Sequence, residues 1–272
     1  MTTKLDPDHP RESETAHQSA MEIFRQPHFS PYKVYLRRDL KLAVFLNPKV
    51  GSSAFRKFLV EGLKNLEAKP QLGRLWPISE KRRYTTAPIG DFLHAFRNRS
   101  EYEFHCFVRN PYARVLSAWN DKLVKGFHAP QYPRSMIKLV PKIRQFAADH
   151  GLPGADDSQP VPFSSFFSYV ESQPEGKRNQ HWDTQTSVLL ARKIPYTHIH
   201  QMEDNFAGAM ANIFERVGIE REWTLQKFQR PVNASGKIKE PVLDQATAHR
   251  VYQLYAEDFQ RFGYDQDSWQ GL

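Results

Sequence analysis

The chain has 272 residues, 40% of them hydrophobic and 13% aromatic, a composition that supports a sizeable core and excludes a wholly disordered or collagen-like protein. Lysine and arginine number 38 against 30 acidic residues, so the formal net charge is +8 at pH 7 and an anionic partner is favoured. The single cysteine, Cys106, excludes an intramolecular disulfide and any zinc site that needs two thiolates. Cys106 stands in the apolar run FHCFV, so we assign it no chemical role.

Residues 1–30 are polar and are interrupted by prolines, which predicts a flexible or loosely docked arm ahead of a single domain over 31–272. The arm has no apolar stretch of the signal-peptide type. No segment approaches the ~18 apolar residues of a membrane helix, so we expect no transmembrane segment, while peripheral contact with a membrane stays open. The sequence does not indicate an oligomeric state.

Two strand-to-helix units follow the arm. The apolar run KLAVFL at 41–46 predicts a strand, and after a turn the residues from Phe55 to Leu66 have helical spacing. FHCFV at 104–108 predicts the second strand, with Asn110 as the cap of the next helix and Pro111 as its first residue.

The second half of the chain continues the alternation. YTHIH at 196–200 predicts a strand, a helix follows from residue 206 to Gly218, and a last helix is predicted over 241–262 with Gly263 as its stop. Strands that alternate with helices predict an α/β fold with a parallel sheet flanked by helices on both faces. Ligands of such sheets bind beyond the carboxyl ends of the strands.

The first strand-to-helix turn, NPKVGSS at 47–53, has the chemistry of an anion site. Gly51 lets the backbone approach an anion, and Ser52 and Ser53 add hydroxyls beside helix N-terminal amides. Lys49 adds a positive charge. An ordinary turn with a solvated lysine explains these residues equally well. The lysine precedes the glycine and a second glycine is absent, so the turn is not a Walker motif and an ATPase is disfavoured.

The second turn lies within FVRNPYARVLSAW at 107–119. Arg109, at the end of the strand, can present a planar fork to a phosphate, and Ser117 lies on the polar side of the helix, within reach of the same ligand. A solvated rim arginine and a packing serine are the alternative. Two similar units that point to the same sheet edge favour the anion sites.

PKVGSS at 48–53 and RNPYARVLSAW at 109–119 resemble the 5′-phosphosulfate loop and the 3′-phosphate motif of sulfotransferases that use 3′-phosphoadenosine 5′-phosphosulfate (PAPS). The resemblance is closest to the carbohydrate sulfotransferases related to the chondroitin 4-O and HNK-1 enzymes, sulfotransferase family 2. It extends from about residue 40 to 265. It includes the segments NQHWDTQTSVL at 179–189, VNASG at 232–236 and YAEDFQRFGYD at 255–265.

The resemblance implies a P-loop-like sulfotransferase fold and an enzyme that transfers a sulfuryl group from PAPS to a hydroxyl of a polysaccharide, oligosaccharide or glycolipid. It implies that the 5′-phosphosulfate is held by Lys49, Gly51, Ser52 and Ser53 and the 3′-phosphate by Arg109 and Ser117. The product would be 3′-phosphoadenosine 5′-phosphate. We expect the region 126–163, which has six prolines, to be an insertion that shapes the acceptor cleft.

The sequence departs from the family at three points. Thr184 stands where the HWxPQ segment has a proline, although His181, Trp182 and Gln185 remain. The membrane anchor and the disulfides of secretory-pathway relatives are absent, so we expect a cytoplasmic protein, as in a bacterial relative.

Two residues are expected to carry the chemistry. Lys49 would neutralise the leaving phosphate, and His181 would take the proton of the acceptor hydroxyl, with Trp182 beside it to stack on a sugar ring. A packed histidine–tryptophan pair is the structural alternative. His94 and Glu203 are the other candidate bases, although a core histidine and an acidic helix cap explain them more simply.

We expect no metal cofactor, because HEXXH and DxDxDG patterns are missing and lysine with backbone amides supplies the positive field. A nucleotide-dependent phosphoryl transferase is one alternative, and it would need a magnesium site. A non-catalytic binder of acidic glycan or nucleic acid is another, supported by net charge alone. We expect a carbohydrate acceptor as partner and no nucleic acid.

Overall fold

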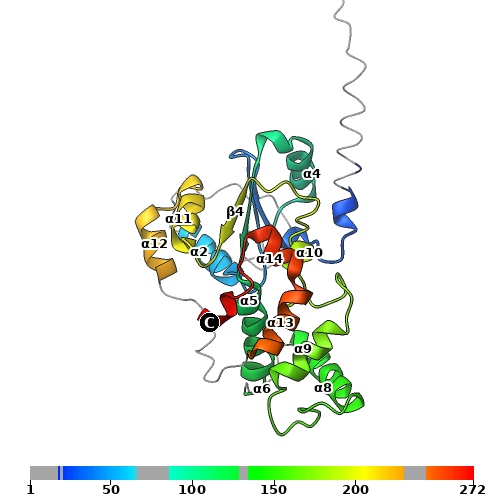
Figure 1. Cartoon of the computed structure of the whole chain (residues 1–272). Coiled ribbons are helices and arrows are strands. Elements are labelled where there is room, and N and C mark those ends of the chain that lie inside the picture. The colour runs from blue at the N-terminus through cyan, green and yellow to red at the C-terminus, as the bar shows by residue number, and fades with distance from the viewer. Residues whose placement is uncertain (1–17, 19–20, 65, 67–85, 129–133, 230–242) are drawn as a thin grey trace, which may run out of the picture. The chain divides into compact units, whose positions relative to one another are not determined.

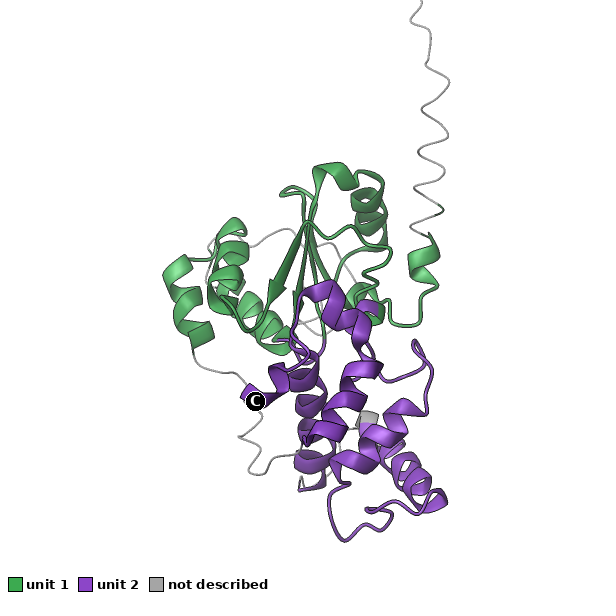
Figure 2. Cartoon of the chain, in the orientation of Figure 1, with its two compact units in different colours: residues 1–47, 51–108, 187–230 green, residues 48–50, 109–186, 231–272 purple. Residues whose placement is uncertain are grey.

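The computed structural model describes residues 18, 21–64, 66, 86–128, 134–229 and 243–272. They fall into two compact units (Figure 2). Unit 1 comprises Met1–Asn47, Gly51–Val108 and Ser187–Arg230, and unit 2 comprises Pro48–Val50, Arg109–Thr186 and Pro231–Leu272. The single domain over 31–272 and the insertion at 126–163 stay predictions.

Unit 1 contains a mixed sheet of four strands in the order β1-β2-β3-β4. Figure 1 labels the last of them, β4. The strands are β1 (Val34–Arg37), β2 (Leu42–Phe45), β3 (Glu103–Val108) and β4 (His198–Gln201). β2, β3 and β4 are parallel, with Val44 opposite His105 and His105 opposite His198. The predicted parallel sheet is therefore confirmed for these three strands, whereas β1 pairs with β2 in the antiparallel direction and was not predicted.

Helices cover both faces of this sheet, as predicted. The described helices of unit 1 include α2 (Ser52–Lys64), α4 (Ile89–Arg97), α11 (Phe206–Arg216) and α12 (Arg221–Gln229), with 3-10 turns at Pro31–Lys33 and Arg99–Glu101. On one face, Phe55 of α2 packs edge-on against Tyr35 of β1, with ring centroids 5.8 Å apart. On the other face, Phe92 of α4 packs against Phe45 of β2 at 6.3 Å.

The described end of the predicted N-terminal arm is docked in unit 1. Ile23 is 1% exposed, and the ring of Phe24 lies 5.4 Å from that of Phe92. Residues 1–17 lie outside the described residues. Apolar packing therefore holds the segment around residues 21–24 in place, although the arm as a whole is polar.

Unit 2 is helical. It contains α5 (Pro111–Trp119), a π-helical turn (Asn120–Val124), α6 (Lys125–Phe127), α7 (Arg134–Ile137), α8 (Leu139–Asp149), α9 (Phe163–Glu171), α13 (Gln245–Leu254), α14 (Ala256–Phe262) and a 3-10 turn (Ser268–Gly271). The short helix α10 (Gln185–Val188) crosses the boundary in the chain between the units. Within the ranges that the structure describes, none of the helices has the length and apolarity that a membrane crossing requires.

The ends of two helices follow the sequence signals. Asn110 caps α5, since its side-chain oxygen accepts from the backbone N–H groups of Tyr112 and Ala113. Gly263 ends α14 in the left-handed conformation with φ 70°, as predicted. The last helix predicted over 241–262 is instead two helices that meet at Tyr255, so that prediction was only partly right.

Candidate active site

Lys49 has an unusual backbone conformation for a non-glycine residue. It follows β2, and its φ of 69° lies in the left-handed region, which costs a residue with a Cβ roughly 1–3 kcal/mol. Its side chain is only 13% exposed, and Nζ lies 3.0 Å from Oδ2 of Asp121. A strained, mostly buried lysine in an ion pair is typical of a binding or catalytic site rather than of a solvated turn.

Asp121 belongs to the π-helical turn that continues α5. Nζ of Lys122 also lies 3.2 Å from its Oδ2, so two ammonium groups share one carboxylate oxygen. Burial raises the pKa of Asp121, but the charges of Lys49 and Lys122 outweigh it and the net pKa is lowered. Asp121 is thus ionised at neutral pH. Single π-helical turns within α-helices are frequent at functional sites, because the extra residue redirects a side chain.

Arg114 joins the Lys49 segment to the segment that carries His181. The guanidinium is buried and donates to three backbone carbonyls, at 3.2 Å to Pro48, 2.9 Å to Gln180 and 2.6 Å to Asp183. A guanidinium has five N–H donors in a rigid fork, so one side chain can fix several carbonyls at once. Sequence reasoning missed Arg114, although it lies within the RNPYARV motif.

Arg109 lies against the Lys49 segment. Its Nη1 donates to the carbonyl of Lys49 at 3.4 Å. The side chain of Gln185 makes two hydrogen bonds to the backbone of Arg109. The Oε1 of Gln185 accepts from the Arg109 N–H at 2.9 Å, and the Nε2 of Gln185 donates to the Arg109 carbonyl at 2.7 Å. The structure therefore brings Arg109 to Lys49, although the two are far apart in sequence.

His181 lies in the segment that Arg114 holds. Its backbone N–H donates to Oδ1 of Asn179 at 3.0 Å, whereas its ring Nδ1 is enclosed and has no hydrogen-bond partner among the described residues. Burial lowers the pKa of His181 to about 3, and the positive charges of Lys122 and Lys49 act in the same direction. The ring is neutral at pH 7, and its Nδ1 is buried without a described protein partner.

The other predicted anion-binding residues are divided between the units. Ser117 is buried on α5, three residues after Arg114 and four before Asp121, so the three share one face of the helix. Gly51, with φ 72°, precedes α2 in unit 1, and Ser52 and Ser53 are the first residues of that helix. Their backbone N–H groups lie in its first turn, where such groups lack an intrahelical partner.

The alternative bases lie in unit 1. His94 is hydrogen-bonded through Nδ1 to the hydroxyl of Tyr102, at 3.1 Å, and Glu203 is exposed in the turn after β4. The prediction that Trp182 stacks on a sugar is wrong, because its side chain is fully buried and packs edge-on against Phe166 with centroids 5.2 Å apart. VNASG at 232–236 lies outside the described residues.

Thr184, the departure from the HWxPQ pattern, is buried and well bonded. Its backbone N–H donates to Oδ1 of Asp183 at 2.9 Å, and its hydroxyl donates to Oε1 of Glu175. The carboxylate of Asp258 accepts from the N–H groups of Gln185 and Thr186, at 2.6 and 2.8 Å. The segment after His181 is therefore anchored without the proline.

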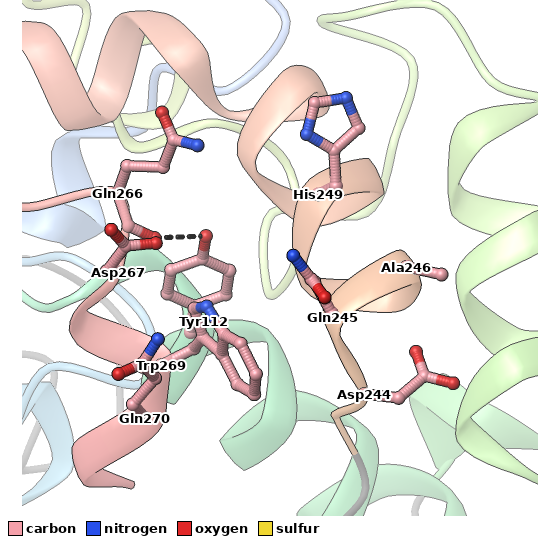
Figure 3. Close-up of a pocket in the computed structure, with 9 residues that line it drawn as sticks. All are labelled: Tyr112, Asp244, Gln245, Ala246, His249, Gln266, Asp267, Trp269 and Gln270. Carbon is pink, nitrogen blue, oxygen red and sulfur yellow. Dashed lines mark hydrogen bonds between the residues drawn. The ribbon is translucent and has the colours of Figure 1, made fainter.

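Unit 2 also contains a pocket of about 750 Å³ (Figure 3). The described residues that line it are Tyr112, Asp244, Gln245, Ala246, His249, Gln266, Asp267, Trp269 and Gln270. The hydroxyl of Tyr112 donates to the carbonyl of Gln266 at 2.7 Å, and Oγ of Ser268 accepts from Nδ2 of the α5 cap Asn110 at the same distance. The pocket is thus joined to the N-terminus of the helix that follows Arg109.

The sequence matches the model of the Sulfotransferase family over residues 39–265, which is most of the chain. The chain belongs to the sulfotransferase family. Carbohydrate sulfotransferase 11 from Mus musculus and the protein of the same name from Rattus norvegicus are each 23% identical to it over 164 residues. The match covers 58% of this chain but only 46% of each relative, so it spans less than half of their length. No solved structure matches.

The family match confirms the predicted family, and both segments predicted to bind anions lie within the matched range. In this sulfotransferase-family chain, the π-helical turn with Asp121 follows directly on the second motif. Sequence reasoning also missed Asp121. The only signal for it was a carboxylate followed by a lysine just beyond RNPYARVLSAW.

Proposed function

We propose that this sulfotransferase-family chain transfers the sulfuryl group of PAPS to a hydroxyl of a carbohydrate. The observation that carries the proposal is the strained, mostly buried Lys49 in its ion pair with Asp121, electrostatically coupled to the neutral His181. The carbohydrate is inferred from the names of the two relatives.

The residues present fit an anionic nucleotide. Lys49, Lys122 and Arg109 supply cationic donors within unit 2, and the enclosed Nδ1 of His181 lacks a described protein partner. A donor with phosphate groups at two ends needs at least two such donor-rich points. When bound, PAPS supplies the sulfuryl group. The segment from Lys49 to Ser53 binds its 5′-phosphosulfate, and Arg109 with Ser117 binds its 3′-phosphate.

The transfer forms a bond from the acceptor oxygen to sulfur as the bond from sulfur to the phosphate oxygen breaks. The proton of the acceptor hydroxyl passes to a ring nitrogen of His181, which is neutral beforehand. The bound anionic donor offsets the charges of Lys49 and Lys122, which lower the pKa of this ring in the empty site, and so makes the ring a better proton acceptor. Lys49 neutralises the charge that develops on the leaving phosphate, an interaction that is stronger in the transition state than in the ground state. Asp121 acts through Lys49 as a positioning residue.

The 750 Å³ pocket suits a sugar unit of the acceptor. Tyr112 and Trp269 offer aromatic faces, and Gln245, Gln266 and Gln270 offer amides that can bind hydroxyls. Asp244 and Asp267 also line it, and two carboxylates repel a phosphate. The pocket is therefore assigned to the acceptor rather than to the nucleotide.

A ligand comparison tests the donor. The protein is heated with 3′-phosphoadenosine 5′-phosphate, with ATP and magnesium, or with a short oligonucleotide, since a ligand of the native state raises the melting temperature. Stabilisation by the first alone supports the proposal. Stabilisation by ATP and magnesium alone would indicate a phosphoryl transferase, and by the oligonucleotide alone a nucleic-acid binder.

Transfer of labelled sulfate to a panel of carbohydrates tests the acceptor. We expect Trp269→Ala to raise the KM for the acceptor about tenfold with a smaller change in kcat, because lost stacking weakens ground-state binding. The KM for PAPS should not change. An equal rise in KM for the acceptor and for PAPS would show that the pocket does not bind the acceptor specifically. The cytoplasmic location stays a prediction.

A further inference from the structure

A cluster of histidines and one glutamate lies on the sheet of unit 1, outside the residues assigned above. Glu103 and His105 belong to β3, and His198 and His200 belong to β4. Parallel pairing places His105 directly opposite His198, so both side chains leave the same face of the sheet. Alternation along each strand puts Glu103 and His200 on that face as well.

We propose that Glu103, His105 and His198 bind a divalent first-row transition metal ion, of which zinc is the reference case. One ligand atom from each residue lies within 4.8 Å of the ligand atoms of the other two. Two imidazoles and a carboxylate are a ligand set that such ions accept in proteins. Magnesium and calcium prefer all-oxygen sites and are not expected here.

Ring nitrogens of both histidines already have hydrogen-bond partners. Nδ1 of His105 lies 3.0 Å from Nε2 of His200, and its Nε2 lies 3.2 Å from Oε2 of Glu103. Nδ1 of His198 lies 3.0 Å from the hydroxyl of Thr197, which assigns Nε2 as its ligand atom. In metal sites the second ring nitrogen of a ligand histidine usually has such a hydrogen-bond partner.

A small movement would complete the geometry. The rings of His105 and His198 are stacked, with centroids 4.3 Å apart and an angle of 6° between them, so their lone pairs run parallel rather than converge. Ligand bonds of roughly 2.0–2.2 Å require convergence, so metal binding must turn the ring of His198 out of this stack. His198 is exposed, so its ring can leave the stack and its contact with the Thr197 hydroxyl, whereas the side chain of His105 is only 8% exposed.

Arg216 competes for the carboxylate. Its Nη1 forms an ion pair with Oε2 of Glu103, and its Nη2 donates to the carbonyl of Leu40 at 2.9 Å. A bound cation must either displace this guanidinium or share the Glu103 carboxylate with it. Two positive groups on one carboxylate repel each other, so Arg216 weakens metal binding. The geometry therefore predicts that loss of the Arg216 charge strengthens metal binding. Hydrogen bonds alone, without a metal site, would not produce that result.

The bound ion would join β3 to β4 across their first residue pair. The strands have only hydrogen bonds and stacked rings there, and β4 is the last strand of the described sheet. An ion that binds only the folded sheet raises the free energy of unfolding by mass action. The inferred role is structural and does not depend on the proposed sulfuryl transfer.

The test uses the full chain after dialysis against EDTA. Zinc chloride is titrated by calorimetry, and cobalt chloride is followed through its visible absorption, with magnesium chloride as the negative probe. We expect one zinc per chain with a Kd in the micromolar range or below, and a rise in melting temperature with zinc. His198→Gln should weaken zinc binding at least tenfold, and Arg216→Gln should strengthen it.

Two controls keep the result interpretable. His249→Gln replaces an exposed histidine of unit 2 and should leave zinc binding unchanged. Without metal, His198→Gln should lower the melting temperature only slightly, since the side chain is exposed and the change removes only its ring contact with His105. Millimolar affinity for zinc, or equal affinity in the parent and in His198→Gln, would overturn the proposal.

Discussion

Lys49 is the residue on which the proposed chemistry depends most. Lys49→Ala removes the charge that neutralises the leaving phosphate, so we expect kcat for sulfate transfer to fall roughly 10²-fold or more. The measurement is kcat at saturating PAPS and acceptor. Lys142→Ala, a change at an exposed lysine of α8, should leave kcat within experimental error of the parent. Equal kcat for Lys49→Ala and the parent would refute the role.

Gly51 is constrained by both its backbone and its surroundings. Its φ is +72°, and a Cβ built there would lie 2.2 Å from Cζ of Phe206. We expect Gly51→Ala to lower the free energy of unfolding by about 1–3 kcal/mol, because the alanine is strained and Phe206 must move. The check is urea unfolding. Gly90→Ala is the matched control, since nothing lies within 4 Å of that position, and it should be neutral or slightly stabilising.

Candidate site residues could be named from the sequence only where a local motif marked them. Lys49, Arg109 and His181 stand in recognisable turns, and the structure places all three in unit 2. Asp121 could not be found in this way, because its partner Lys49 is distant in sequence. The use predicted for Trp182 failed because an aromatic residue beside a polar motif has the same local pattern whether it faces a ligand or the core.

At the scale of elements, Arg114 is the connection between α5, the Lys49 segment and the His181 segment. Arg114→Met leaves the carbonyls of Pro48, Gln180 and Asp183 without their donor, so we expect a loss of roughly 3 kcal/mol or more in the free energy of unfolding.

Arg250→Met is the comparison variant for this prediction. Arg250 of α13 pairs with Glu171, and their side chains are 38% and 30% exposed, so its loss should cost no more than about 1 kcal/mol. Both variants are measured by urea unfolding under identical conditions. If Arg114→Met were no less stable than Arg250→Met, the connecting role would be wrong.

The ends of helices could be predicted where the signal in the sequence was a local one. The cap at Asn110 and the stop at Gly263 were predicted because each acts within a few residues. β1 was missed because four residues are too few for a clear alternation. The cluster proposed to bind a metal was missed for another reason. His105 and His198 meet only through strand register, and no spacing along the chain shows it.

For the whole molecule, the titration of His181 links stability to pH. Its pKa is lowered to about 3 from 6.5, mainly by burial, so between these values the unfolded chain binds a proton there that the folded chain does not. This residue therefore makes the folded state less stable as the pH falls from 6.5 towards 3, by at most about 1.4 kcal/mol per pH unit.

His181→Asn removes this titration. The free energy of unfolding of the variant should fall less steeply than that of the parent between pH 6.5 and 4.5, as measured by urea unfolding at several pH values. At pH 7 and above, where neither state binds the proton, the difference between the two proteins should be constant. Parallel curves through the acid range would show that His181 has an ordinary pKa.

Because Asn120–Val124 forms a π-helical turn, the number of residues in this stretch determines where the Asp121 side chain points. A π-helical turn contains one residue more than an α-helix would use for the same advance. Deletion of Asn120 would let the backbone relax into a continuous α-helix and swing Asp121 about 100° around the axis, away from the Lys49 ammonium. The deletion of this one residue should thus leave the chain folded but lower its turnover. Few deletions within a helix can produce that outcome.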